Sequence, residues 1–102
     1  MICNTSTLVK SIDVMLKWKR HRDTVRSLYL YDKENGEKKY RDVIRSRQKI
    51  IHSIMRAEGL SIIEAVTKVI EEALKNRGME QMRWLSAAYE LAQGNDFAAA
   101  EY

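Results

Sequence analysis

Apolar residues recur at the three- and four-residue spacing of an α-helix along most of this chain, and no segment alternates like a β-strand. The 102-residue sequence has no proline, and its four glycines, Gly36, Gly59, Gly78 and Gly94, each fall between two helical segments. Solitary glycines in such places are typical of turns and helix ends. The pattern predicts a single all-α domain (1–102), a compact bundle of four helices at about 5–31, 38–58, 61–77 and 79–93, with a short C-terminal helical turn at about 96–102.

The segment from Gly59 to Gly78 has the clearest helix signals. Ser61 and Glu64 have the spacing of a capping box, and Gly78 suits the left-handed conformation that ends many helices. Its apolar arc is wide enough to contact two neighbours, so we expect this helix to be central, packed against the 38–58 and 79–93 helices. The arc comprises Ile62, Val66, Val69, Ile70, Ala73 and Leu74.

The first helix has an apolar face that changes direction along its length. Leu8, Ile12 and Met15 share one side, whereas Trp18, Val25 and Tyr29 lie further round the helix. A bend or break within 19–23 would reconcile the two halves. A polar loop over 32–37 follows, built around an Asn-Gly turn signal.

One arginine interrupts the apolar stripe of the 38–58 helix. Arg47 projects from the middle of this stripe, where an unpaired charge is costly. We expect its long side chain to reach past its neighbours into solvent, or else to meet an acid such as Asp13 or Glu58.

Several classes of function find no support in the sequence. The single cysteine, Cys3, cannot form an internal disulfide, and nothing near the start resembles a signal peptide, so we expect a cytoplasmic protein. No apolar run approaches the ~18 to 20 residues that span a bilayer, so we expect no membrane partner. Cys3, His21 and His52 lie far apart, and every glycine is solitary. We therefore expect no metal, no cofactor, no catalytic residue and no enzymatic activity.

Charge is distributed unevenly along the chain. Residues 1–50 contain thirteen Lys/Arg against six Asp/Glu, whereas residues 51–102 contain five against eight. Within the 38–58 helix, basic residues at steps of four, four, three and four form a basic stripe, which comprises Arg41, Arg45, Lys49, His52 and Arg56. A second basic cluster surrounds an aromatic residue, and it comprises Lys17, Trp18, Lys19, Arg20, His21, Arg22 and Arg26. Such sets suit phosphate contacts and base stacking, although charge runs are often only solvated surface.

The helix from Ser61 to Leu74, with its pattern Ser-x-x-Glu-Ala-Val-x-x-x-Ile-x-x-x-Leu, is similar to the second helix of ribbon-helix-helix repressors. The preceding Gly59-Leu60-Ser61 turn resembles a helix-turn-helix junction. These resemblances imply a dimeric DNA-binding regulator. However, residues 39–51 keep a helical period where a ribbon strand is needed, and the outward positions carry Glu64, Glu71 and Glu72. If DNA is bound, we expect the basic stripe to bind it.

The end of the chain resembles half a tetratricopeptide unit. The resemblance rests on Trp84, Ala88, Leu91, Gly94, Phe97 and Ala100. No second copy follows, and stacked arrays need about three repeats. We therefore interpret this region as a helical hairpin.

Taken together, these patterns favour a small, non-enzymatic interaction protein. We expect its basic surface to dock on another macromolecule and to modulate or inhibit it. An acidic protein is the favoured partner, and a protein that itself handles nucleic acid is one candidate, because acids and bases are segregated and no base-reading helix is evident. The alternative is a DNA-binding transcriptional regulator, in which the chain forms a homodimer.

Overall fold

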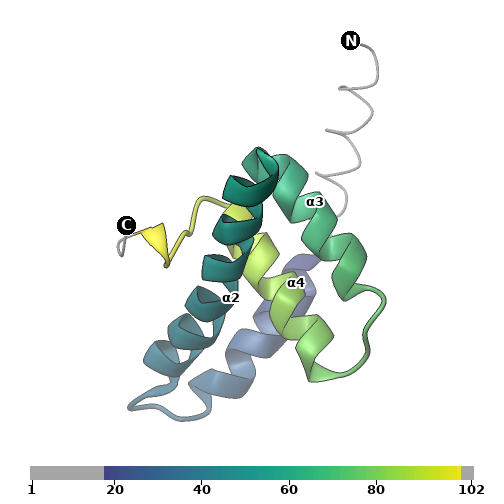
Figure 1. Ribbon diagram of the computed structural model, residues 1–102. Coiled ribbons are helices and arrows are strands. Elements are labelled where there is room, and N and C mark those ends of the chain that lie inside the picture. The colour runs from purple at the N-terminus through teal and green to yellow at the C-terminus, as the bar shows by residue number, and fades with distance from the viewer. Residues whose placement is uncertain (1–17, 100–102) are drawn as a thin grey trace.

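The structure, a computed structural model, describes residues 18–99 as a bundle of four helices without a strand (Figure 1). A helix covers residues 18–30, and three more follow: α2 (Gly36–Glu58), α3 (Ile62–Ala73) and α4 (Met79–Ala92). The predicted all-α fold is confirmed. The expected start of the first helix near residue 5, its Leu8, Ile12 and Met15 face, and the end of the last turn lie outside the described residues.

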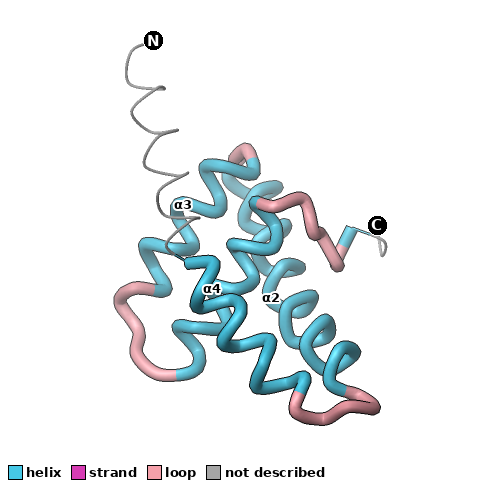
Figure 2. Tube along the Cα trace, turned by 180° about the vertical axis from the view of Figure 1, so that it is seen from behind, coloured by secondary structure: helices cyan, strands magenta, loops and turns pink. Residues whose placement is uncertain are grey.

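Helix α4, rather than α3, occupies the centre of the bundle. Every residue from Leu85 to Leu91 is buried, so α4 is covered on all sides along this stretch. Ser86, Ala87 and Ala88 have small side chains, which allow neighbouring helices to approach closely. In Figure 1, α4 lies between α2 and α3, and helix 18–30 lies behind α4. Figure 2 shows the same arrangement from behind, with helix 18–30 in front of α4. The predicted packing of the 61–77 helix against both α2 and α4 is confirmed, but its predicted central position is wrong, because α4 is the more enclosed helix.

Helix α3 starts as predicted but ends early. The Ser61 hydroxyl accepts from the Glu64 amide at 3.2 Å, and the Glu64 carboxylate accepts from the Ser61 amide at 3.0 Å, which confirms the capping box. The helix ends at Ala73, four residues before the predicted end. Gly78 does have a positive φ of 82°, but it precedes α4 instead of terminating α3.

The early end of α3 changes which of its residues are covered. The part of the predicted arc that packs in the core is Val66, Val69, Ile70 and Ala73, joined by Ala65. Ile62 and Leu74 stand at the two ends of the helix and remain 45% and 49% exposed. Periodicity therefore predicted the direction of the buried face but overestimated its length.

Gly36 sets the close crossing between helix 18–30 and α2. Residues 19–23 are helical throughout, so no break interrupts the described part of the first helix. The chain turns at 31–35, where the Asp32 carboxylate accepts from the Asn35 amide at 3.1 Å. Helix α2 then begins at Gly36, two residues before the predicted start. A Cβ atom on Gly36 would lie 2.2 Å from the Tyr29 carbonyl oxygen, so the two backbones meet here without room for a side chain.

We expect Gly36→Ala to destabilise the fold by about 1–3 kcal/mol, because the added methyl group forces the two backbones apart. Urea unfolding followed by circular dichroism measures the change. The control is Lys38→Ala, an exposed position in the first turn of α2, for which we expect a change within about 0.5 kcal/mol. Equal midpoints for Gly36→Ala and wild type would contradict the proposed contact.

Candidate functional site

The basic stripe runs along the outer side of α2. Arg41 and Arg45 have side chains that are 62% and 35% exposed, and Lys49 and Arg56 are exposed as well. Arg41 Nε lies 3.9 Å from a Glu37 carboxylate oxygen, and Arg45 pairs with Asp42 on the same helix. Exposed pairs of this kind contribute at most about 1 kcal/mol, so a stronger anion can replace the acid.

The fold brings an arginine of the basic cluster to the stripe. Arg26 on helix 18–30 and Arg41 on α2 both face the carboxylate of Glu37. Helix 18–30 and α2 are joined by the short 31–35 turn and lie side by side, which places Arg26 near the first turn of α2. We call the combined surface the basic face, and it comprises Arg26, Arg41, Arg45, Lys49 and Arg56.

Other members of the basic cluster point elsewhere. Trp18 was expected to face a partner, but it is only 7% exposed and lies in the core, with its ring edge-on to His21 at 4.6 Å. The reason is that Trp18, Val25 and Tyr29 share the inner face of their helix. Its indole therefore has no surface on which a base can stack. Lys17 lies outside the described residues.

Two exposed cations of the cluster remain on the outer side of helix 18–30. Lys19 pairs with Asp23 one turn later at 3.2 Å. Arg20 is exposed and forms no ion pair with any described residue. Neither one joins the basic face through a contact in the structure.

A buried carboxylate, Glu90 on α4, takes up Arg22. Glu90 is 3% exposed, and its oxygens lie 3.0 Å from Arg22 Nη1, 2.8 Å from the Tyr40 hydroxyl and 3.1 Å from Asn95 Nδ2. Arg22, which the sequence suggested as a partner-binding residue, is thus engaged inside the molecule. Burial, together with the hydrogen bond to Glu90, raises the pKa of the Tyr40 hydroxyl above its ordinary value. Glu90 was not predicted to be a buried site residue, although an acid within the apolar stretch 85–91 is a usable signal.

His52, the fourth residue of the stripe, also has an internal contact. Its Nε2 atom lies 2.6 Å from a carboxylate oxygen of Asp96, and its side chain is 18% exposed. Asp96 follows α4 in the chain, at the start of the predicted C-terminal turn. His52 is therefore less accessible than Arg41 or Arg45.

Arg47 meets an acid that the sequence did not single out. It pairs with Glu80 in the first turn of α4, and its guanidinium lies 5.8 Å from the centre of the Trp84 ring. Burial opposes ionisation of Glu80, but hydrogen bonds from Arg47 and Arg83 hold the pKa of its carboxyl below the usual range. Asp13 lies outside the described residues, and Glu58, the other acid expected to meet Arg47, pairs with Lys68 instead.

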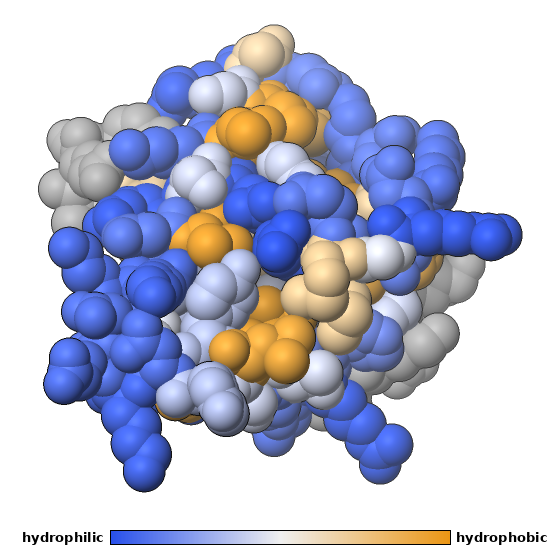
Figure 3. Space-filling view, turned by 90° about the horizontal axis from the view of Figure 1, so that it is seen from below, coloured by the Kyte–Doolittle hydropathy of each residue, from blue (hydrophilic) through white to orange (hydrophobic). Residues whose placement is uncertain are grey.

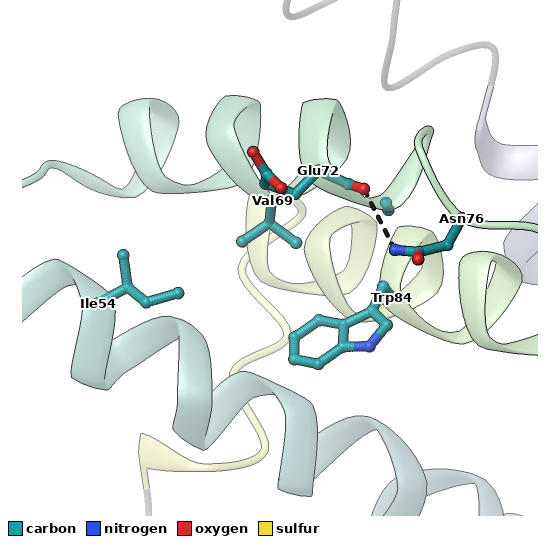
Figure 4. A pocket seen from close by; sticks show the side chains of 6 residues that line it. Ile54, Val69, Glu72, Asn76 and Trp84 are labelled. Atoms are coloured by element: carbon teal, nitrogen blue, oxygen red, sulfur yellow. Dashed lines mark hydrogen bonds between the residues drawn. The ribbon is translucent and has the colours of Figure 1, made fainter.

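A small pocket of about 150 Å³ opens between α2, α3 and α4 (Figure 4). Ile54, Val69 and Trp84 point into it, and a volume of this size holds about one benzene-sized group. Its polar lining consists of Glu72, which pairs with Lys75, and Asn76, which donates to the Glu72 carbonyl at 3.3 Å. These groups include no nucleophile beside a base, so the pocket has no arrangement for acid–base or covalent chemistry.

Away from the basic face, the described surface mixes hydrophilic residues with exposed hydrophobic ones such as Leu28, Ile50 and Ile63. Figure 3 shows that the end of the molecule near the 31–35 turn is mainly hydrophilic, with hydrophobic atoms in separate patches. Within residues 18–99, no three His, Cys, Asp or Glu side chains gather in a way that could hold a metal ion. None of the helices in this range has both the length and the apolar character needed to cross a bilayer.

Comparisons with known proteins leave the family open. No protein-family model, curated protein or solved structure matches this chain significantly.

The buried Tyr40 hydroxyl predicts a distinctive response to alkaline pH. Because the pKa of the Tyr40 hydroxyl is raised in the folded state, its burial in the network contributes stability that is complete below about pH 10. This stability is lost as pH rises further, because only the unfolded chain then releases the phenol proton. We expect the free energy of unfolding to fall above pH 10 by up to about 1.4 kcal/mol per pH unit more in wild type than in Tyr40→Phe. Urea unfolding at a series of pH values measures both slopes.

The matched control is Tyr31→Phe, because the Tyr31 side chain is 92% exposed. This variant should keep the wild-type slope. If Tyr40→Phe kept it as well, the Tyr40 hydroxyl would not be held in its protonated form by the buried network.

Proposed function

We propose that this chain is a small, non-enzymatic cytoplasmic protein that docks its basic face on an acidic surface of another protein and modulates that partner. The observation that carries the proposal is the meeting of Arg26 and Arg41 at Glu37, which unites two basic segments that lie apart in the sequence. Positive patches of this kind steer association with acidic partners and fix the orientation of docking.

The chemistry of the basic face favours a partner-binding surface over a charged surface that contacts only solvent. Arg41 and Arg45 carry planar guanidinium groups, which can form paired hydrogen bonds with carboxylates. Their present partners, Glu37 and Asp42, are themselves exposed, so exchanging them for a partner's carboxylates costs little.

A protein partner is favoured over DNA for two reasons. The outward side of α3 carries exposed acids, Glu64, Glu71 and Glu72, which oppose phosphates at the helix that would otherwise read the groove. Trp18 and Arg22 are also withdrawn from the surface, so the aromatic and one cation of the basic cluster do not contribute to base or phosphate contacts. The DNA-binding regulator remains the alternative that the experiment below tests.

We expect the triple reversal Arg41→Glu, Arg45→Glu, Lys49→Glu to leave folding intact and to weaken binding to an acidic probe by more than about tenfold, because repulsion replaces attraction across the interface. The measurement is fluorescence anisotropy of a labelled poly-glutamate peptide, repeated with a labelled random DNA duplex. Circular dichroism verifies the fold of each variant.

A matched control reverses Lys68, Lys75 and Arg77, which are exposed on and after α3 and give the same change in net charge. Equal weakening by both triple variants would show that only total charge matters and would overturn the assigned surface. Binding of the duplex that falls steeply and log-linearly with salt, without binding of poly-glutamate, would favour the DNA-binding alternative.

A further inference from the structure

The segment that follows α4, residues 94–99, lies alongside α2 on the side away from α3 (Figures 1 and 2). We call it the tail. Its backbone is fixed by Gln48, a fully buried residue of α2. Gln48 Nε2 donates to the Asn95 carbonyl at 2.9 Å, and Gln48 Oε1 accepts from the Phe97 amide at 2.8 Å. The tail therefore has a defined place beside the basic stripe.

Two side chains of the tail contact the stripe directly. The Asp96 carboxylate lies 2.6 Å from His52 Nε2, and the Phe97 ring centre lies 5.9 Å from the Arg41 guanidinium carbon. Arg41 and His52 are separated by three turns, or about 16 Å along α2. The tail thus places an acid at His52 and an aromatic ring near Arg41.

These contacts are separate from the anchor. The peptide groups bound by Gln48 hold the tail in place whatever the charge on Asp96, and Ala98 is fully buried beside them. Asp96 uses its other oxygen, Oδ1, to accept from the Ala98 and Ala99 amides at 3.2 Å. The contact between the other oxygen, Oδ2, and His52 can therefore be broken while the hydrogen bonds of the last turn remain.

We propose that the tail is an intramolecular competitor of the acidic partner, in which the Asp96 carboxylate holds His52, the stripe residue between Lys49 and Arg56, and so weakens docking on the adjoining basic face. This inference rests on the proposed function and adds its regulation. A tethered group acts at a high effective concentration, so even a weak contact lowers the apparent affinity of an external ligand. A partner must supply enough further contacts, at Arg41, Arg45 and Lys49, to displace the carboxylate.

The test compares Asp96→Asn with wild type in binding the labelled poly-glutamate peptide. Asparagine keeps an Oδ1 acceptor for the Ala98 and Ala99 amides but removes the carboxylate charge, and we expect about threefold to tenfold tighter binding. The control is Glu71→Gln, which makes the same charge change at an exposed position on α3. Should Asp96→Asn fail to fold, Asp96→Ser keeps a capping oxygen and replaces it.

The outcomes separate the two proposals. The first outcome is that Asp96→Asn and Glu71→Gln bind with equal affinity, while the triple reversal of Arg41, Arg45 and Lys49 still abolishes binding. That outcome would overturn the competitor and leave the docking surface standing. If that reversal does not weaken binding, the docking surface is wrong and the competitor falls with it. Tightening only in the Asp96 variant supports both.

Discussion

The fold depends on the compensation of one buried charge, the carboxylate of Glu90. Helix α4 is enclosed along 85–91, and a carboxylate there is stable only if its oxygens find donors. Its three donors come from different segments: Arg22 from helix 18–30, Tyr40 from α2 and Asn95 from the tail. All of these segments must dock on α4 in one arrangement to satisfy it. The apolar core supplies attraction, and this network specifies the geometry.

The same arrangement determines which charges reach the surface. Arg22 faces inward to Glu90, and Arg26, one turn later on the same helix, faces Glu37 and the start of α2. The tight crossing at Gly36 holds the two helices close enough for Arg26 and Arg41 to share that acid. The basic face is thus a consequence of the hairpin that the first helix forms with α2, and not of α2 alone.

Local sequence signals predicted the helices well, because caps and periodicity act within a few residues. The Ser61 capping box and the left-handed Gly59 at the end of α2 follow from this local chemistry. The central position of α4 did not, because hydrophobic patterning undervalues small residues such as Ser86 and Ala87, which let helices approach. The roles of Gln48 and Glu90 depend on partners 47 and 68 residues away, and no spacing rule within one helix predicts such partners.

The tail illustrates how one helix can serve both the core and the surface. On α2, Gln48 lies on the buried side and binds peptide groups of the tail, whereas His52 and Arg41 lie at the border of the exposed side and meet its side chains. Buried hydrogen bonds between neutral groups respond little to salt or to external anions, but a partly exposed carboxylate contact responds to both. The tail is anchored by the buried hydrogen bonds of Gln48, so it can give up the Asp96–His52 contact without loss of the fold. A tethered competitor requires this property.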